Sequence, residues 1–221
     1  MSRAVLFFDF DNTLTRGDVL DKAIEEFSPD DAWREWEDAW ANGRLGARDC
    51  LQRQVENMRV HRAALLDYFS RVQVDPVFAN IVGWARPRGV DVFIVSDNFE
   101  PLIREALRGN GIEEVPVFAN GLEFAGEDRL VPSFPFHDPA CGRAANAKAR
   151  HLAPYARNHI IFAGDGRSDL DAALAADVVF AKSTLARELD AISVAFRPFD
   201  TLEPVLEYLQ AGGPADATPR R

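Results

Sequence analysis

The stretch 6-LFFDFDNTLT-15 decides the fold of this chain. The run from Ala4 to Phe8 is continuously apolar, which is typical of a short strand that is buried on both faces of a parallel sheet. Two aspartates follow at once, Asp9 and Asp11, with one residue between them. Carboxylates are seldom buried without a partner, so the pair needs a structural or a chemical reason. Side chains two residues apart in an extended chain point the same way, and the two acids can therefore face one cleft.

Three further apolar runs have the same character: 90-VDVFIVS-96, 159-HIIFAG-164 and 177-DVVFA-181. Helical patterns lie between them, notably at 99–109 and 168–176. Strands that alternate with helices predict an α/β fold with a Rossmann-like parallel sheet. Ligands of such sheets bind outside the carboxyl ends of the strands, so Asp9, Ser96 and Asp165 are expected at one edge.

The segment 16–75 has a different character, because it contains no strand-like run and reads as helical throughout. It contains three of the four tryptophans, Trp33, Trp36 and Trp40. Ser28 followed by proline and two acids predicts the start of a helix. Further helices are predicted at 48–59 and 61–71. We therefore expect a small helical cap inserted after the first strand.

The remaining residues, 1–15 and 76–221, are expected to form the α/β core. Within it, two extended pieces with a turn at 125–128 predict a β-hairpin flap near 117–136. The small, polar and proline-containing tail at 212–221 is expected to lack regular structure.

Composition limits the classes of partner. The formal net charge of −10 and the pI near 4.9 argue against a broad contact surface for nucleic acid or for an anionic membrane. The two cysteines, Cys50 and Cys141, make no disulfide framework or metal-ligand spacing, which is typical of a reducing compartment. The apolar run before Asp9 is only a few residues long, so we expect neither a signal peptide nor a spanning helix there. We expect a cytoplasmic monomer or homodimer that acts on a small molecule.

A second acidic segment, 164-GDGRSD-169, follows another buried strand. Asp9 and Asp11 alone are equally well explained as a solvated pair at a strand end. Close carboxylates repel each other unless a proton or a cation lies beside them. Oxygen ligands that converge from two strands suit Mg²⁺. Asp165 and Asp169 therefore strengthen the prediction of a metal site.

Two further polar residues complete the pattern. Ser96 ends a strand and precedes a helix, so it is either a plain N-cap or part of a phosphate seat at a helix N-terminus. Lysine is rare in this chain: only Lys22, Lys148 and Lys182 occur among 25 basic residues. Lys148 can neutralise a carboxylate and a phosphate together, although a solvated helix position is the alternative and Lys182 is a competitor.

These elements together resemble the haloacid dehalogenase superfamily, whose phosphatases use an aspartate as the nucleophile. The resemblance rests on DFDNT at 9–13, on Ser96, on Lys148 and on GDGRSD at 164–169, which occur in the family's order and span most of the chain. It implies the α/β fold of that superfamily with a small cap and a Mg²⁺-dependent phosphatase activity.

The resemblance also implies roles for single residues. Asp9 would be the nucleophile that forms an aspartyl-phosphate. Asp11 would be the acid and base that protonates the leaving alcohol and then activates water. Ser96 and the backbone N–H of Asp97 would bind phosphoryl oxygens, and Lys148 would hold both Asp9 and the phosphate.

The implied metal ligands are Asp9, the backbone carbonyl of Asp11, and Asp165. Asp169 would orient the groups around the metal or Lys148, and Thr13 would support the metal ligands without being one of them. Phosphoryl transfer needs positioning and charge neutralisation, which a metal and a lysine supply. Next to Mg²⁺ the Asp9 carboxylate stays ionised, whereas the Asp11 side chain can hold a proton near neutral pH.

Within the superfamily, the helical insertion is similar to the cap of the phosphoserine-phosphatase-like branch. The methionine-salvage 2-hydroxy-3-keto-5-methylthiopentenyl-1-phosphate phosphatase family is closer still, because it shares a small cap, a flap near 118-FANGLEF-124 and a Cys-Gly pair like Cys141-Gly142. That family usually has a cysteine cluster where this chain reads 140-ACGRAANAK-148, and glycine is usual where this chain has Asp97 or Asn98. These departures leave the substrate open.

The sequence gives no decisive role to several residues near the motifs. Asp97 is interpreted as an exposed acid in the first turn of a helix rather than as a substrate contact. Arg44, Arg48 and Met58 of the cap are within reach of a substrate, but solvated or core positions are favoured for each.

The sequence therefore predicts a Mg²⁺-dependent phosphomonoester hydrolase for a small metabolite, acting in methionine salvage or as a phosphoserine-phosphatase-like enzyme. A phosphotransferase or phosphomutase that uses the same aspartate is the first alternative. The second alternative is a non-catalytic phospholigand-binding module on the same fold.

Overall fold

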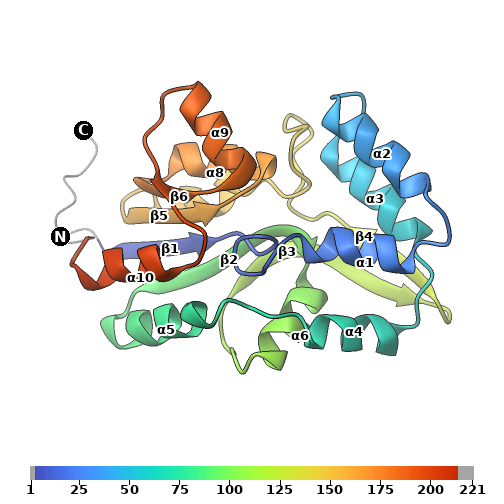
Figure 1. Cartoon of the computed structure of the whole chain (residues 1–221), viewed down its shortest axis with the longest axis horizontal. Coiled ribbons are helices and arrows are strands. Elements are labelled where there is room, and N and C mark those ends of the chain that lie inside the picture. Colours follow the sequence, from blue (N-terminus) through green and yellow to red (C-terminus); the bar gives the residue numbers. More distant parts are fainter. Residues whose placement is uncertain (1–2, 214–221) are drawn as a thin grey trace.

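A mostly parallel sheet of seven strands runs through the middle of the computed structural model, which describes residues 3–213 (Figure 1). The strand order is β4-β3-β2-β1-β5-β6-β7. The strands are β1 (Ala4–Phe8), β2 (Asp91–Phe99), β3 (Val117–Ala125), β4 (Arg129–Ser133), β5 (His159–Gly164), β6 (Val178–Ala181) and β7 (Arg197–Pro198). The predicted α/β fold is confirmed. Most of the tail discussed above, residues 214–221, lies outside the described residues.

Strand β1 occupies the centre of the sheet, parallel to β2 on one side and to β5 on the other. Phe7 lies opposite Phe93 in β2 and opposite Phe162 in β5. All five residues of β1 are buried. Alternate side chains of a strand point to opposite faces, so the continuous apolar run fills two cores, one on each face of the sheet.

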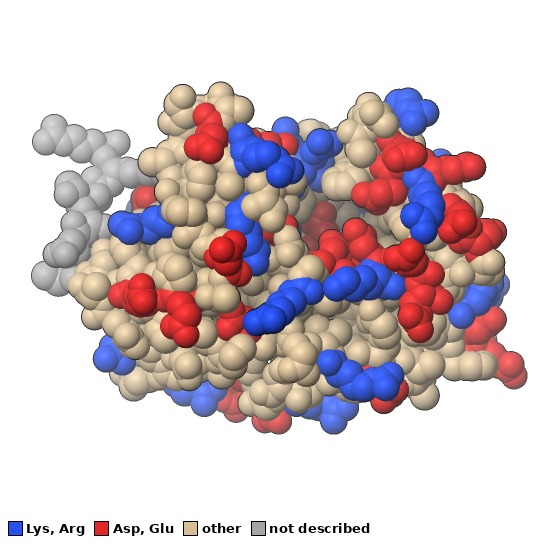
Figure 2. Space-filling model, in the orientation of Figure 1, with Lys and Arg blue, Asp and Glu red and all other residues tan. Residues whose placement is uncertain are grey.

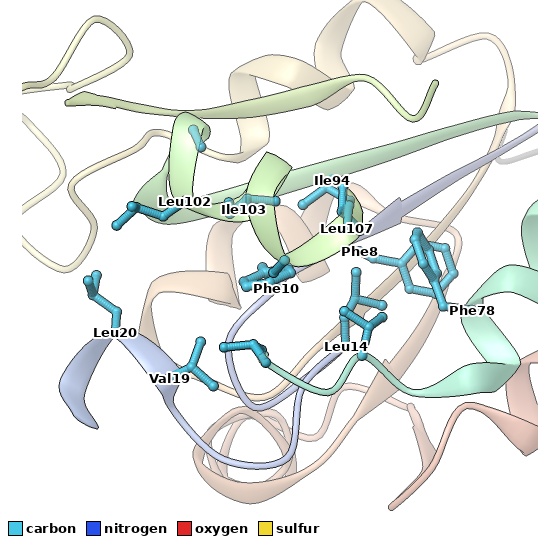
Figure 3. Packing of buried hydrophobic residues seen from close by; sticks show 14 of the residues in the cluster. Phe8, Phe10, Leu14, Val19, Leu20, Phe78, Ile94, Leu102, Ile103 and Leu107 are labelled. Atoms are coloured by element: carbon cyan, nitrogen blue, oxygen red, sulfur yellow. The ribbon is translucent and has the colours of Figure 1, made fainter. Parts of the chain in front are cut away.

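Helices cover both faces of the sheet (Figure 1). The helices of the core are α5 (Pro76–Ala85), α6 (Glu100–Gly109), α7 (Ala149–Leu152), α8 (Leu170–Ala175), α9 (Ser183–Ala191) and α10 (Glu203–Gln210). Phe8 packs edge-on against Phe78 of α5, with 5.3 Å between the ring centroids, and Ile94 and Leu107 lie beside it (Figure 3). On the other face, Phe7 shares a core with Leu152, Leu185 and other residues of α7, α8 and α9.

Four helices lie between β1 and α5, namely α1 (Val19–Phe27), α2 (Ala32–Ala41), α3 (Ala47–Asn57) and α4 (Arg62–Ser70). The chain leaves the sheet and returns to it at one place, because Thr15 forms a β-bridge with Val74. Helix α4 packs on α6 so closely that a Cβ at Gly109 would lie 2.0 Å from the Ser70 carbonyl oxygen. Whether residues 16–75 act as a cap stays a prediction.

Two local predictions have different outcomes. The predicted hairpin is confirmed, since β3 and β4 pair in antiparallel register with Ala125 opposite Arg129. The predicted helix start at Ser28 is wrong. Ser28 is extended and its N–H donates to the Ile24 carbonyl, so it ends α1, and Asp31 is the residue that precedes α2.

Candidate active site

Asp9 and Asp11 lie at the carboxyl end of the central strand. The Asp9 N–H donates to the Ala163 carbonyl at 2.9 Å, which continues the β1–β5 ladder by one residue. Phe10, between the two acids, is fully buried in the core. The two carboxylates therefore point away from that core and line the same cavity, as the alternation in the sequence predicts.

Lys148 joins two acidic segments at the base of this cavity. Its Nζ donates to Asp9 Oδ1 at 2.8 Å and to Asp169 Oδ1 at 2.6 Å, and it also contacts Ser168 Oγ at 3.2 Å. Burial alone disfavours an ammonium ion, but Asp169 and Asp9 together raise the pKa of Lys148 well above its ordinary value. Lys148 is thus a fixed positive charge against the Asp9 carboxylate.

Asp169 organises the turn that follows β5. It is fully buried, and its Oδ2 accepts the backbone N–H groups of Asp165 and Gly166, each at 2.9 Å. With Lys148 on Oδ1, both of its oxygens accept hydrogen bonds. A Cβ at Gly164 would lie 2.6 Å from Asp169 Oδ2, so this glycine is required by close packing.

Asp165 is held by the segment that follows Asp11. Its Oδ2 accepts from Asn12 Nδ2 at 2.5 Å, and its Oδ1 accepts from Thr13 Oγ1 at 3.4 Å. Asn12 has a left-handed φ of 49°, which asparagine tolerates better than most residues. Burial, with the Asp169 carboxylate, raises the pKa of Asp165 to about 6. The sequence identified Thr13 at this place but not Asn12.

The Asp11 carboxylate sits against the start of α1. Its Oδ1 accepts the N–H groups of Val19 at 3.0 Å and Leu20 at 3.2 Å, and its Oδ2 accepts from Asn98 Nδ2 at 2.8 Å. Burial, with the Asp18 carboxylate, raises the pKa of Asp11 to about 8. The side chain can therefore hold a proton near neutral pH while three donors fix its orientation.

Ser96 is buried and lines the same cavity, but not at a helix N-terminus. Strand β2 continues to Phe99, which pairs with Asn120 of β3, and α6 begins at Glu100. The predicted strand end at Ser96 and the helix N-terminus there are therefore wrong. Ser96 Oγ accepts the N–H of Asn98 at 3.1 Å within a bulged end of the strand.

The interpretation of Asp97 as an exposed acid in a helix turn is also wrong. Asp97 belongs to β2 and is only partly exposed. Its Oδ2 accepts the Ala145 N–H at 2.8 Å and its Oδ1 accepts the Asn146 N–H at 3.0 Å. Its carboxylate thus binds the segment that carries Lys148.

The cavity has a volume of about 170 Å³ and extends from Asp9 to the helices α2 and α3. Figure 2 shows acidic side chains gathered around the hollow between the α8–α9 side and the α2–α3 side. Residues of α1 to α3 also line it: Leu20, Asp21, Glu37, Trp40, Ala47, Cys50, Leu51 and Gln54. Burial, with Asp18 and Glu37, raises the pKa of Asp21 to about 8. The sequence had not assigned these residues to the site.

Other candidates from the sequence lie elsewhere. Met58 is buried in the core, and Arg48 pairs with Asp49 at 2.8 Å. Arg44 lines a neighbouring hollow rather than this cavity. Lys182 donates to the Asp200 carbonyl at 3.2 Å, so of the two competing lysines only Lys148 reaches Asp9.

The donors at the strand ends fit a divalent cation. Asp9, Asp165 and Asp169 each offer an oxygen within 4.8 Å of the others. The Lys148 ammonium pairs with two of these carboxylates, those of Asp9 and Asp169, and burial with Asp169 raises the pKa of Asp9. An all-oxygen donor set with excess negative charge fits Mg²⁺. Asp169 already accepts three hydrogen bonds, so Asp9 and Asp165 are the better candidates for ligands.

A model of the haloacid dehalogenase-like hydrolase family matches residues 6–174 of the chain. The chain belongs to this family. The matched region includes all the motif residues described above, and the family membership predicted from the sequence is confirmed.

Two bacterial phosphatases are similar to this chain over nearly its whole length. The chain is 27% identical to a 2-hydroxy-3-keto-5-methylthiopentenyl-1-phosphate phosphatase of Brevibacillus brevis, with 94% of this chain and 96% of the relative covered. It is 29% identical to a protein of the same name from Geobacillus kaustophilus, with 93% and 95% covered. The enzyme class predicted with the family, a phosphatase, is therefore confirmed as well.

Solved structures of phosphoserine phosphatases share the fold. One, titled as a phospho-aspartyl intermediate analogue, superposes with a TM-score of 0.69 at 18% identity and covers 94% of this chain and 99% of its own. Another, from T. onnurineus, has a TM-score of 0.69 at 19% identity and covers 95% of each chain. Within residues 3–213, no helix has both the length and the apolar character that crossing a membrane requires.

Proposed function

We propose that this phosphatase hydrolyses phosphate monoesters of a small metabolite in a Mg²⁺-dependent reaction, through an aspartyl-phosphate on Asp9. One observation carries the proposal: Asp9, Asp11, Ser96, Lys148 and Asp165 line one cavity of about 170 Å³ although they come from four separate segments of the chain. Phosphoryl transfer depends mainly on such positioning and on charge neutralisation.

In the first step, Asp9 attacks the phosphorus atom and the bond to the leaving oxygen breaks. Lys148 binds Asp9 Oδ1, so the other carboxylate oxygen is available for the attack. Ser96 and the backbone N–H of Asp97 are proposed to bind the phosphoryl oxygens, because Ser96 and Asp97 line the same cavity as Asp9 and Lys148. Lys148 then faces both Asp9 and the phosphoryl group and neutralises their charge.

Asp11 is proposed to handle the proton in both steps. With a pKa of about 8, it holds a proton that it donates to the leaving alcohol. The resulting carboxylate then removes a proton from a water molecule, which attacks the phosphorus atom and releases Asp9 and inorganic phosphate. Asn98 and the N–H groups of Val19 and Leu20 keep the side chain in place during both transfers.

The residues proposed to hold Mg²⁺ are Asp9, the backbone carbonyl of Asp11, and Asp165, with Asp169 and Thr13 supporting them. When bound, the cation supplies positive charge for the phosphoryl oxygens and lowers the pKa of neighbouring carboxylates. Thr13 and Asn12 orient Asp165, and Asp169 fixes the backbone of the same turn.

We propose that the segment 16–75 is a cap that closes one end of the cavity and that the substrate is therefore small. Glu37 and Trp40 of α2 and Gln54 of α3 line that end. The names of the two bacterial relatives make 2-hydroxy-3-keto-5-methylthiopentenyl-1-phosphate the first substrate to test. Phosphoserine is the second, because phosphoserine phosphatases share the fold.

A cytoplasmic location is proposed on the basis of the cysteines, since Cys50 and Cys141 are both free thiols. A monomer or a homodimer is compatible with a cavity that a single chain lines. Gel filtration of the purified protein would decide between the two states.

Release of phosphate from p-nitrophenyl phosphate, followed by a panel of metabolite phosphates, tests the function. We expect steady release with Mg²⁺, loss of release with EDTA, and loss in Asp9→Asn, whose amide cannot form the acyl-phosphate. Continued turnover by Asp9→Asn would refute the nucleophile assignment. Addition of acceptor alcohols distinguishes a hydrolase from a phosphotransferase, because a transferase would produce new esters in place of free phosphate.

A further inference from the structure

Lys148 is carried by a segment without regular structure. Strand β4 ends at Ser133 and α7 begins at Ala149, so residues 134–148 form neither helix nor strand. The ladder of the sheet therefore does not set the position of Lys148. Contacts to other segments must fix its position, because ordering a mobile loop each time Lys148 binds Asp9 would cost a large amount of conformational entropy.

Asp97 provides the first of these contacts. Its two carboxylate oxygens accept the consecutive N–H groups of Ala145 and Asn146, at 2.8 and 3.0 Å. A charged acceptor makes each of these bonds stronger than a bond between neutral groups. The backbone carbonyl of Asp97 accepts from Asn120 Nδ2 at 2.6 Å, which connects this part of β2 to β3. The segment is thus bound to the sheet two residues before Lys148.

Asn146 provides the second contact. Its side chain is fully buried, and its Nδ2 donates to the carbonyls of Ser96 at 3.0 Å and Phe118 at 2.9 Å. Its Oδ1 lies 2.9 Å from His151 Nε2. Its backbone carbonyl accepts the Lys148 N–H at 2.7 Å. Asn146 therefore connects β2 and β3 to α7 and to Lys148.

We propose that Asp97 and Asn146 form a clamp that fixes Lys148 against Asp9, and that Asp97 is a positioning residue whose side chain does not bind the substrate. The inference rests on the proposed function, in which Lys148 faces the phosphoryl group. The geometry favours positioning because both oxygens of Asp97 already bind the segment 145–146. An Asp97 carboxylate that pointed at the bound phosphoryl group would repel the negative charge of that group.

The position of Lys148 can be measured without any activity. The chain contains only three lysines, so a protein labelled with ¹³C and ¹⁵N at lysine gives three Nζ signals in its NMR spectrum, and Lys148→Arg identifies the one that belongs to Lys148. We expect Asp97→Ala to move this signal towards that of a solvated lysine and to leave those of Lys22 and Lys182 in place. A Lys148 signal that stays unchanged in Asp97→Ala would overturn the clamp even if the protein showed no phosphatase activity.

Kinetics provide the second test, with p-nitrophenyl phosphate as the substrate. Asp97→Ala is expected to lower kcat by about 100-fold, since misplacement of a catalytic group by about 1 Å has effects of that size. In a Lys148→Ala background the same change should lower kcat by less than about 3-fold, because the residue through which Asp97 acts is already absent. Equal losses in the two backgrounds would show that Asp97 acts independently of Lys148.

Two further variants separate positioning from loss of the fold. Asp97→Asn keeps the shape but leaves one oxygen for two N–H donors, so we expect a loss of about 10-fold in kcat. If Asp97→Ala does not fold, Asp97→Asn takes its place in the NMR experiment and in the kinetic experiment. Asp138→Asn is the matched control, because Asp138 Oδ1 also accepts an N–H of this segment, that of Ala140 at 3.0 Å, away from Lys148. It should change kcat by less than about 2-fold.

Discussion

Gly164→Ala tests whether close packing behind the turn of GDGRSD holds the site together. The added Cβ would lie 2.6 Å from Asp169 Oδ2 and 2.7 Å from a ring carbon of Phe162. Ordinary contact begins at 3.4 Å, so Asp169 Oδ2 would have to withdraw by about 0.8 Å and the Phe162 ring carbon by about 0.7 Å. Neither is free to do so, because Phe162 is fully buried and Asp169 accepts three hydrogen bonds.

The expected cost follows from this overlap. Overpacking of a well-packed core costs about 1–3 kcal/mol, and we expect Gly164→Ala to lower the free energy of unfolding by that amount. In a chain of this length each kcal/mol corresponds to about 2–4 °C in Tm. Displacement of Asp169 also moves Lys148, so kcat should fall by about 10- to 100-fold. Urea unfolding followed by tryptophan fluorescence, with steady-state kinetics, measures both effects.

Gly166→Ala is the matched control two residues away. Its Cβ would lie 3.7 Å from Asp169 Oδ2, which is ordinary contact, and Gly166 has a φ of −101° that alanine adopts without strain. Loss of freedom in the unfolded chain should therefore stabilise this variant by about 0.4–1 kcal/mol. The reasoning would be refuted if Gly164→Ala were as stable as the wild type, or if both variants were destabilised equally.

Two further outcomes are expected. In metal-free protein the free energy of unfolding should fall as the pH rises from about 4 to about 8. The folded state raises the pKa of Asp11 to about 8 and that of Asp165 to about 6, so in this range it keeps protons that the unfolded state has released. Calorimetry should then show that Mg²⁺ raises Tm more at pH 8 than at pH 5; an equal rise at both would contradict the acidic metal site. Asp21 and Glu37 line the cavity, and burial raises the pKa of both, that of Asp21 to about 8. Above that pH, where Asp21 is ionised, esters of amino alcohols should have a higher kcat/KM than esters of hydroxy acids, and Glu37→Gln should reduce the difference. A preference for hydroxy-acid esters would show that these acids do not face the leaving group.

Local patterns allowed much of the fold to be predicted. The apolar runs of β1 and β5 have the predicted bounds, and the hairpin of β3 and β4 lies where turn residues separate two extended pieces. Errors arose where the signal for an end was ambiguous. Ser28 fits the start of a helix by its neighbours, yet it ends the preceding helix, and β2 extends past Ser96 because pairing of Phe99 with Asn120 overrides the local signal.

The sequence by itself determined the chemistry of the strand ends. Asp9, Asp11 and Asp165 were identified because they directly follow apolar runs, which is a local property, and parallel strands bring their carboxyl ends to one edge. Lys148 was identified by the rarity of lysine in this chain and by the order of the family's motifs. The tertiary structure alone decided how these groups are held. Asn98 meets Asp11 across 87 residues of sequence, and Asp97 meets Asn146 across 49. Such contacts between polar groups that are far apart in the sequence leave no periodic signal, so only the folded chain reveals which residues orient the catalytic groups.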